Sequence, residues 1–384
     1  MSWGKLVQIL IFLFSSSSFA LTNAEVRALD LPKELLEIEN KDIESFKLYD
    51  GLEMQSLVLG PKEGPSAILI TGYGSNQLYY LQTAIELSKN GYRTYLFNPR
   101  GLGNNIFKSQ NHRGNTEFSI IRIIEDFHQI AEIIFTRNSK PVLVMGHSLG
   151  GIIVRFLELG IGLHNNKIYY SKERSQLFRS RVAVKVVASS PGIIVSPEKV
   201  KMDWETRNFL TSLPYLLDLN HLFEPFTKYL LKLPFSKETL LLSLRGASYA
   251  SPSVKGILDP SLINKKEAWN FIKYGSAEEI PAELKDDLIK MAENPGRVIR
   301  YKNSQLDIID IYESQKNNRV PLILTYGEDD YLVDKSIIQQ EIQFLEKEGS
   351  EVKLLELEGS HMNTVIGFNN IRRIVSETLK LSSK

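Results

Sequence analysis

Val142-Leu143-Val144-Met145-Gly146-His147-Ser148-Leu149-Gly150-Gly151 is the stretch of sequence that decides the fold. Four apolar residues, typical of a strand buried on both faces, lead directly into a serine between two glycines. A helical pattern begins at Leu149. A serine on a sharp turn from strand to helix needs small neighbours on both sides, and Gly146 and Gly150 provide them. The stretch therefore predicts a strand, a tight turn that presents Ser148, and a helix.

Strand-length apolar runs alternate with helix-length amphipathic segments on both sides of this stretch. We expect strands at residues 67–70, 93–97, 142–145, 182–188, 321–325 and 352–357, and helices at residues 78–90, 118–137 and 336–347. Residues 46–59 alternate around Asp50-Gly51, a pair that favours a tight turn, and so predict two antiparallel strands at a sheet edge. The alternation predicts an α/β protein whose mostly parallel central sheet is flanked by helices.

The alternation stops after Pro197 and resumes at Val320. The intervening leucine- and phenylalanine-rich segment is broken by prolines, which favours short helices separated by turns. We therefore expect a helical cap at residues 197–319, inserted between two parts of the core at residues 44–196 and 320–384. Its apolar side chains suit an acyl pocket or a lipid-facing lid, and equally the cap's own core.

The N-terminus has the order of a secretory signal peptide: Lys5, an apolar run at residues 6–14, a serine run, and Ala20. The apolar run is too short to span a bilayer as a helix. We expect a leader at residues 1–20 and export to the periplasm or the medium. A second cut near Thr22 and Ala24, and an uncleaved membrane anchor, stay open as alternatives.

Composition excludes several classes of function. The 384 residues hold 46 Lys and Arg against 45 Asp and Glu, so no net field favours a nucleic-acid partner. The absence of cysteine rules out a disulfide scaffold, a thiolate nucleophile and a cysteine-based metal site. No other metal site is indicated, and the oligomeric state stays open.

A serine hydroxyl is a weak nucleophile unless a base takes its proton. His361 follows the strand expected at residues 352–357, so it should emerge at the same sheet edge as Ser148. An acid to orient it should come from another strand end, where Asp329 and Asp330 compete. His147 is expected to point away from the base, and the remaining histidines read as ordinary surface or packed residues: His112, His128, His164 and His221.

Backbone amides should stabilise the charge that develops on a substrate oxygen. The first is the amide of Leu149, directly after the nucleophile. The second should come from the glycine-containing loop at residues 71–76, where Tyr73 is best placed. An ordinary loop between a strand and a helix is the alternative reading of this segment.

Taken together, these motifs resemble the α/β-hydrolase fold superfamily, in particular its serine esterases and lipases of the monoacylglycerol-lipase-like type. The likeness covers residues 46–381 apart from the cap. Five segments carry it: Ile70-Thr71-Gly72-Tyr73-Gly74, Asn98-Pro99-Arg100-Gly101-Leu102-Gly103, Gly146-His147-Ser148-Leu149-Gly150-Gly151, Gly327-Glu328-Asp329-Asp330 and Gly359-Ser360-His361. The chain departs from the family pattern at Thr71, where many relatives have histidine, and at Asn98, where they commonly have aspartate.

The resemblance implies that Ser148, Asp330 and His361 form a catalytic triad in the chain order serine, acid, histidine. The spacing from Gly327 selects Asp330 over Asp329. A serine at the turn sets aside the relatives that use an aspartate there.

The implied reaction is cleavage of a carboxyl ester through an acyl-enzyme, and it requires no cofactor. The expected partner is a small-molecule or lipid ester, with transient contact between the cap and a membrane surface. Acyl transfer to an alcohol, amide or thioester hydrolysis on the same triad, and a non-catalytic binding module stay open, as does the length of the acyl chain.

Overall fold

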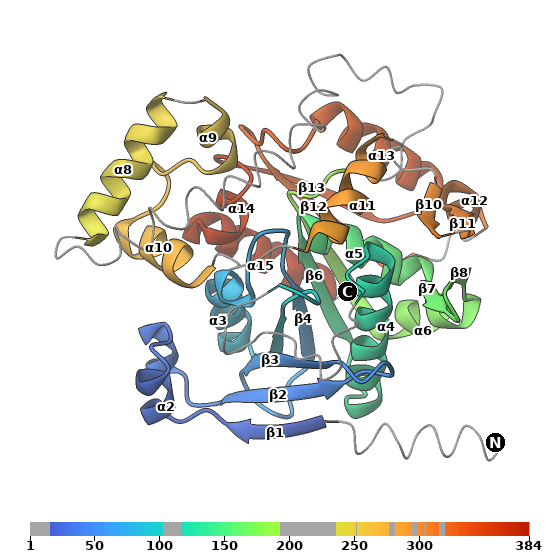
Figure 1. Ribbon diagram of the computed structural model, residues 1–384, viewed down its shortest axis with the longest axis horizontal. Helices are drawn as coiled ribbons and strands as arrows, with labels where there is room; N and C mark the ends of the chain where they lie inside the picture. Colours follow the sequence, from blue (N-terminus) through green and yellow to red (C-terminus); the bar gives the residue numbers. More distant parts are fainter. Residues whose placement is uncertain are drawn as a thin grey trace.

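A nine-stranded sheet forms the centre of the protein (Figure 1). The computed structural model describes residues 16–102, 117–192, 236–250, 252–275, 281–293, 298–302, 304–314 and 319–383. The strand order is β1-β2-β3-β5-β4-β6-β9-β12-β13. The strands are β1 (Ser16–Ala20), β2 (Lys41–Lys47), β3 (Glu53–Leu59), β4 (Ser66–Ile70), β5 (Arg93–Phe97), β6 (Val142–His147), β9 (Val182–Ala188), β12 (Leu322–Gly327) and β13 (Val352–Leu357).

The six strands from β5 to β13 pair in parallel, while β1, β2 and β3 pair antiparallel with their neighbours. Residues of β4, β5 and β6 are buried throughout, which explains their continuous apolar runs. The predicted α/β class with a mostly parallel sheet is confirmed.

Helices cover both faces of the sheet and form two apolar layers (Figure 1). One layer holds side chains of α4 (Ile120–Arg137), α5 (Leu149–Leu159), α6 (Lys172–Arg181) and α13 (Lys335–Lys347). The other holds side chains of the 3-10 helix η2 (Gln77–Tyr80), α3 (Leu81–Lys89), α14 (Asn363–Ile366) and α15 (Phe368–Ser382). The predicted helix at residues 78–90 thus begins with a 3-10 turn.

The N-terminal edge of the sheet differs from the prediction. The two antiparallel strands form as expected, but β1 pairs with β2 on its outer side, so β1 and not β2 is the edge strand. After β1 come α2 (Asn23–Ala28), capped by Thr22, and the 3-10 helix η1 (Lys33–Glu37). Because β1 lies inside the predicted leader, cleavage after Ala20 would remove it and leave the backbone groups of β2 unpaired on that side.

The segment between β9 and β12 holds mainly helices in its described part. These are α8 (Ser236–Ala250), α9 (Pro252–Ile257), α10 (Lys265–Asn270), the π-helix η3 (Phe271–Gly275), α11 (Ala282–Glu293) and α12 (Ile308–Glu313). A hairpin of β10 (Val298–Tyr301) and β11 (Ser304–Asp307) interrupts them, and a second hairpin, β7 (Ile161–His164) with β8 (Lys167–Tyr170), follows α5. The sequence patterns predicted neither hairpin.

Several predictions concern residues outside the described part of the chain. Residues 197–235 of the expected cap, residues 1–15 of the expected leader, and His112 and His221 lie there. The cap boundaries therefore remain a prediction. In the described ranges, no helix has both the length and the apolarity needed to cross a bilayer.

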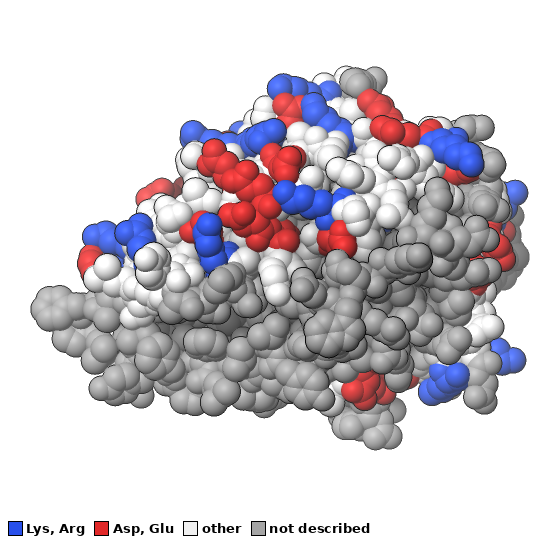
Figure 2. All heavy atoms as spheres, turned by 90° about the horizontal axis from the view of Figure 1, so that it is seen from above, with Lys and Arg blue, Asp and Glu red and all other residues white. Residues whose placement is uncertain are grey.

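Figure 2 shows the molecule from above, with side chains of both charges side by side over the described part of this face. This mixture agrees with the formal net charge of +1. The described atoms of this face therefore supply no patch of a single sign that would steer a polyanion.

His128 makes the stability of the fold depend on pH. Its ring is buried in α4, and Nε2 lies 2.9 Å from the carbonyl oxygen of Ile161. Burial is the main cause that lowers its pKa from 6.5 to about 3. Between pH 6.5 and about pH 3, His128 is therefore protonated in the unfolded chain but neutral in the folded chain. The free energy of unfolding falls as the pH decreases through this range.

We expect the free energy of unfolding of the wild-type protein to fall by about 2 kcal/mol through His128 when the pH is lowered from 7 to 5. Below the unfolded-state pKa of His128, each pH unit changes this free energy by about 1.4 kcal/mol. His128→Gln keeps a hydrogen-bond donor for the Ile161 carbonyl and should abolish the pH-dependent loss that is due to His128. Urea unfolding of both proteins at pH 7 and pH 5 measures this difference. The control is His164→Gln, because His164 is exposed. Identical pH dependence in wild type and His128→Gln would contradict the assignment.

Candidate functional site

Ser148 occupies a strained turn between β6 and α5. Its φ is 53° and its ψ is −118°, a conformation that residues with a side chain rarely adopt. The Ser148 N–H donates to the Ala188 carbonyl at the end of β9 (3.0 Å), and its own carbonyl accepts from the Gly151 N–H (3.0 Å). The residue is half-buried. These contacts hold the serine at the carboxyl edge of the sheet.

Glycines make this turn sterically feasible. A Cβ on Gly150 would lie 2.1 Å from the Ile70 carbonyl oxygen, and one on Gly146 would lie 2.1 Å from the Gly150 carbonyl oxygen. A Cβ on Gly72 would lie 3.0 Å from Ser148 Cβ. The loop after β4 thus packs directly against the serine, and any side chain at Gly146 or Gly150 would push α5 away from the sheet.

Asp330 and His361 meet at the ends of β12 and β13. His361 Nδ1 lies 3.1 Å from both carboxylate oxygens of Asp330, and their side chains are 4% and 1% exposed. Asp330 Oδ1 also accepts from the Leu332 N–H at 2.9 Å. Because a carboxylate can only accept, Nδ1 carries the proton in this bond, which leaves Nε2 as the basic nitrogen.

The neighbouring carboxylate has a different environment. The Asp329 side chain is 49% exposed, and one of its oxygens lies 3.3 Å from Lys255 Nζ. Its backbone N–H donates to the Gly359 carbonyl at 2.9 Å. A Cβ on Gly327 would lie 2.3 Å from that same carbonyl oxygen. The turn after β12 and the turn at Gly359 therefore approach each other so closely that position 327 requires glycine. In this arrangement Asp330, and not Asp329, contacts the imidazole.

His147 lies closer to His361 than the sequence reasoning expected. Its Nε2 donates to the His361 carbonyl at 3.1 Å, and the two rings have centroids 4.6 Å apart. The Tyr79 ring packs edge-on against its other side at 5.5 Å. Burial lowers the pKa of His147 well below its ordinary value, so the ring is neutral. The expectation that it points away from the base is wrong, because His147 packs between Tyr79 and His361.

The expected oxyanion residues belong to the start of α5 and to the loop after β4. Leu149 is the first residue of α5, whose N-terminal amides have no acceptor within the helix. Tyr73 is half-buried and follows Gly72, where an added Cβ would lie 3.0 Å from Ser148 Cβ. Asn98, which departs from the family pattern, is buried, and its Oδ1 accepts from the Gln77 N–H at 2.5 Å, which ties this loop region to the end of β5.

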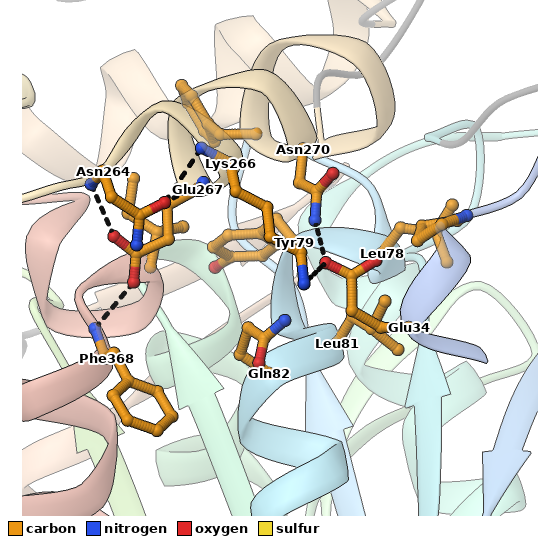
Figure 3. A pocket seen from close by; sticks show the side chains of 13 residues that line it. Glu34, Leu78, Tyr79, Leu81, Gln82, Asn264, Lys266, Glu267, Asn270 and Phe368 are labelled. Atoms are coloured by element: carbon orange, nitrogen blue, oxygen red, sulfur yellow. Dashed lines mark hydrogen bonds and ion pairs between the residues drawn. The ribbon is translucent and has the colours of Figure 1, made fainter. Parts of the chain in front are cut away.

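A separate cavity of about 280 Å³ lies between the core helices and the segment between β9 and β12, which we call the insertion. In Figure 3, Lys266 and Asn270 point to Glu34, while Glu267 connects Asn264 with the backbone of Phe368. Neither Ser148, Asp330 nor His361 lines it. The described residues that line it include no serine or histidine, so it offers no arrangement of nucleophile and base. In the described ranges, no cluster of His, Asp or Glu side chains suits a metal ion.

Comparisons with known proteins agree with this architecture. Residues 65–159 match the family model described as serine aminopeptidase, S33. That range includes the loop after β4 and Ser148, but neither Asp330 nor His361. No curated protein sequence matches the chain significantly.

Solved structures match over most of the chain at low identity. E-2-(acetamidomethylene)succinate hydrolase is 11% identical with a TM-score of 0.56, covering 89% of this chain and 100% of its own. An epoxide hydrolase from Vigna radiata is 16% identical with a TM-score of 0.52 (88% and 98% covered). An esterase from Exiguobacterium antarcticum is 13% identical with a TM-score of 0.52 (88% and 99% covered).

The sheet order, the strained serine turn and these matches define an α/β-hydrolase fold. The α/β-hydrolase fold that the sequence motifs predicted is therefore confirmed, and residues 65–159 are similar to the serine aminopeptidase, S33, family. The matched structures carry several different activities on one fold, so the fold alone does not select a reaction.

The strain at Ser148 generates a stability prediction. Glycine adopts the observed φ and ψ without a clash, whereas alanine retains the Cβ that opposes them. We expect Ser148→Gly to unfold with a free energy about 1 kcal/mol higher than Ser148→Ala, after allowance for the greater chain entropy of glycine. Urea denaturation of the two variants measures this difference. Equal stability, or a more stable alanine variant, would show that the turn stores no strain.

Proposed function

We propose that the protein is a serine hydrolase that cleaves a carboxyl ester through an acyl-enzyme on Ser148. The observation that carries this proposal is the strained backbone of Ser148, a conformation that costs about 1 to 3 kcal/mol and brings no stability of its own. A serine held in this way at a sheet edge is typical of a nucleophile on this fold. A binding module has no need for this strain or for a buried pair of acid and imidazole at the same edge of the sheet.

His361 is the proposed general base and Asp330 the acid that orients it. The hydrogen bonds from Nδ1 to the carboxylate support a tautomer in which Nε2 takes the serine proton. Ser148 then attacks the ester carbonyl, and the protonated imidazole gives the proton to the leaving alcohol. Water, activated by the same imidazole, releases the acid and restores the serine.

The backbone amides of Leu149 and Tyr73 are the proposed donors to the oxyanion. The position of Leu149 at the N-terminus of α5 supports the first, since helix N-termini favour negative charge. The position of Gly72, where an added Cβ would lie 3.0 Å from Ser148 Cβ, supports the second. No step of this mechanism requires a cofactor.

A second candidate is cleavage of an amide, and the description of the family model favours it because it names a serine aminopeptidase. The same groups would act on either bond. Side-by-side assays on matched esters and aminoacyl amides distinguish the two, and turnover of the amides alone would replace the ester proposal. Addition of a competing alcohol separates hydrolysis from acyl transfer through the products formed.

We also propose that the chain is exported by its N-terminal segment. A leader that is cleaved after Ala20 would yield a protein that begins at Leu21 and lacks β1. We expect N-terminal sequencing of the protein recovered after export to read from Leu21. A sequence beginning upstream of Ser16 would show that β1 is retained.

The triad generates a prediction about activity. Hydrolysis of p-nitrophenyl esters of short and long acyl chains should fall by a factor of at least 10³ in Ser148→Ala, and by about 10² or more in Asp330→Asn, which disturbs the orientation of His361. A preference for long chains would support a lipid-like substrate.

Asp329→Asn is the matched control for Asp330→Asn, because its exposed carboxylate follows the same strand. It should keep nearly all activity. Wild-type rates in Ser148→Ala would refute the serine mechanism, and a larger loss in Asp329→Asn than in Asp330→Asn would reverse the choice of acid.

A further inference from the structure

A short segment of the insertion, residues 255–259, contacts the turns that bear the acid and the base. The Gly256 carbonyl accepts from two backbone N–H groups, that of Tyr331 at 3.1 Å and that of His361 at 3.3 Å. Tyr331 follows Asp330 directly. A single carbonyl of the insertion therefore joins the turn that bears the acid to the turn that bears the base.

Further hydrogen bonds extend this contact along the His361 turn. The Met362 N–H donates to the Ile257 carbonyl at 2.8 Å. The Asp259 N–H lies 2.8 Å from both Ser360 Oγ and Asn363 Oδ1, and Asn363 Nδ2 donates back to the Asp259 carbonyl at 2.9 Å. Ser360 Oγ in turn donates to Asn363 Oδ1 at 2.6 Å. Asn363 thus binds both the insertion and the residue that precedes His361.

These bonds are buried, which makes each of them expensive to lose. Ser360 and Asn363 are fully buried and Asp259 is 8% exposed. A buried polar group that loses its partner costs about 1 to 3 kcal/mol. A Cβ on Gly256 would lie 2.5 Å from Tyr331 Cβ, so the approach of this segment to the acid turn requires glycine. By contrast, the ion pair of Lys255 with Asp329 is half-exposed and contributes little.

From these contacts we propose that residues 255–259 form a positioning clamp for Asp330 and His361, with Asn363 as its central side chain. The proposal rests on the proposed function, since it assigns this part of the insertion a role in the same reaction. The hydrogen bonds to Gly256 and Asn363 fix the backbone of both turns. The imidazole is therefore held where Nδ1 faces Asp330, which leaves Nε2 as the nitrogen that can accept a proton.

A positioning role has a large effect on rate because small displacements of a reacting group are costly. A misplacement of about 1 Å lowers a rate by up to about 10²-fold. Asn363 touches neither reacting group in this mechanism, so it acts through His361. Loss of its side chain should therefore lower kcat while leaving KM nearly unchanged, and should also alter the environment of the Nδ1 proton.

The test compares Asn363→Ala with Asn138→Ala. The Asn138 side chain also makes hydrogen bonds, which are half-buried, to Gly64 and Ser66, but it lies at the end of α4, beside the opposite end of the sheet. We expect Asn363→Ala to lose about tenfold or more in kcat on the preferred ester, and Asn138→Ala to keep the wild-type value. Assays are run well below the unfolding temperature of each variant.

The downfield proton NMR signal of His361 Nδ1, assigned by its absence from His361→Gln, supplies a readout that does not depend on turnover. It should broaden or shift in Asn363→Ala and stay unchanged in Asn138→Ala. If Asn363→Ala does not fold, Ser360→Ala, which removes only one hydroxyl of the cluster, is measured in the same way.

Wild-type kcat and an unchanged Nδ1 signal in Asn363→Ala would overturn the clamp. That result would leave the proposed function intact, provided that Ser148→Ala is inactive. Full ester hydrolysis by Ser148→Ala would instead remove the proposed function, and the NMR comparison would still decide whether the insertion holds His361.

Discussion

Ser148 keeps its left-handed backbone only because the start of α5 packs against the ends of β4 and β6. Gly150 lies against the Ile70 carbonyl, Gly72 lies against Ser148 itself, and the Ser148 N–H is fixed by Ala188. Strained residues persist where the surrounding structure determines their conformation. The rest of the site depends on this packing, because the residues of α5 that follow Ser148 are buried and could not present a hydroxyl at the sheet edge.

A buried ion pair fixes two helices of the same layer, α5 and α13, relative to each other. Arg155 on α5 forms two hydrogen bonds with Glu341 on α13, at 2.7 and 2.8 Å, and its third nitrogen donates to Ser190 beyond β9. The pair is 1% and 0% exposed. Desolvation of buried charges offsets most of their attraction, so we infer that such a pair fixes geometry more than it adds stability. It joins the helix of the nucleophile to the helix that follows the acid.

The insertion meets the core at two places. Its α9 end is hydrogen-bonded to the turns of Asp330 and His361, whereas residues of α10 and η3 line the cavity of Figure 3 together with Tyr79. Tyr79 packs on His147, and His147 packs on His361. His361 is thus contacted by the insertion through its backbone and by His147 of the core through its ring, which limits how far its imidazole can move.

Most of the fold followed from local pattern. The central strands were predicted to within a few residues because their apolar runs are buried on both faces, and α4 because its apolar side chains recur every three or four positions. The patterns missed β1 because its serine run resembles a leader, and they missed both hairpins because their strands are four residues long. Short strands leave too little periodicity to recognise.

The sequence by itself determined the turn at Ser148, since an apolar strand, two glycines and a helix follow one another within ten residues. It also placed His361 and the aspartates at strand ends, which parallel pairing brings to one edge. Only the tertiary structure decided that Asp330 meets the imidazole, that His147 packs on His361, and that residues 255–259 hold both turns. Those contacts join residues up to 214 positions apart, and their geometry depends on how whole strands, turns and the insertion pack.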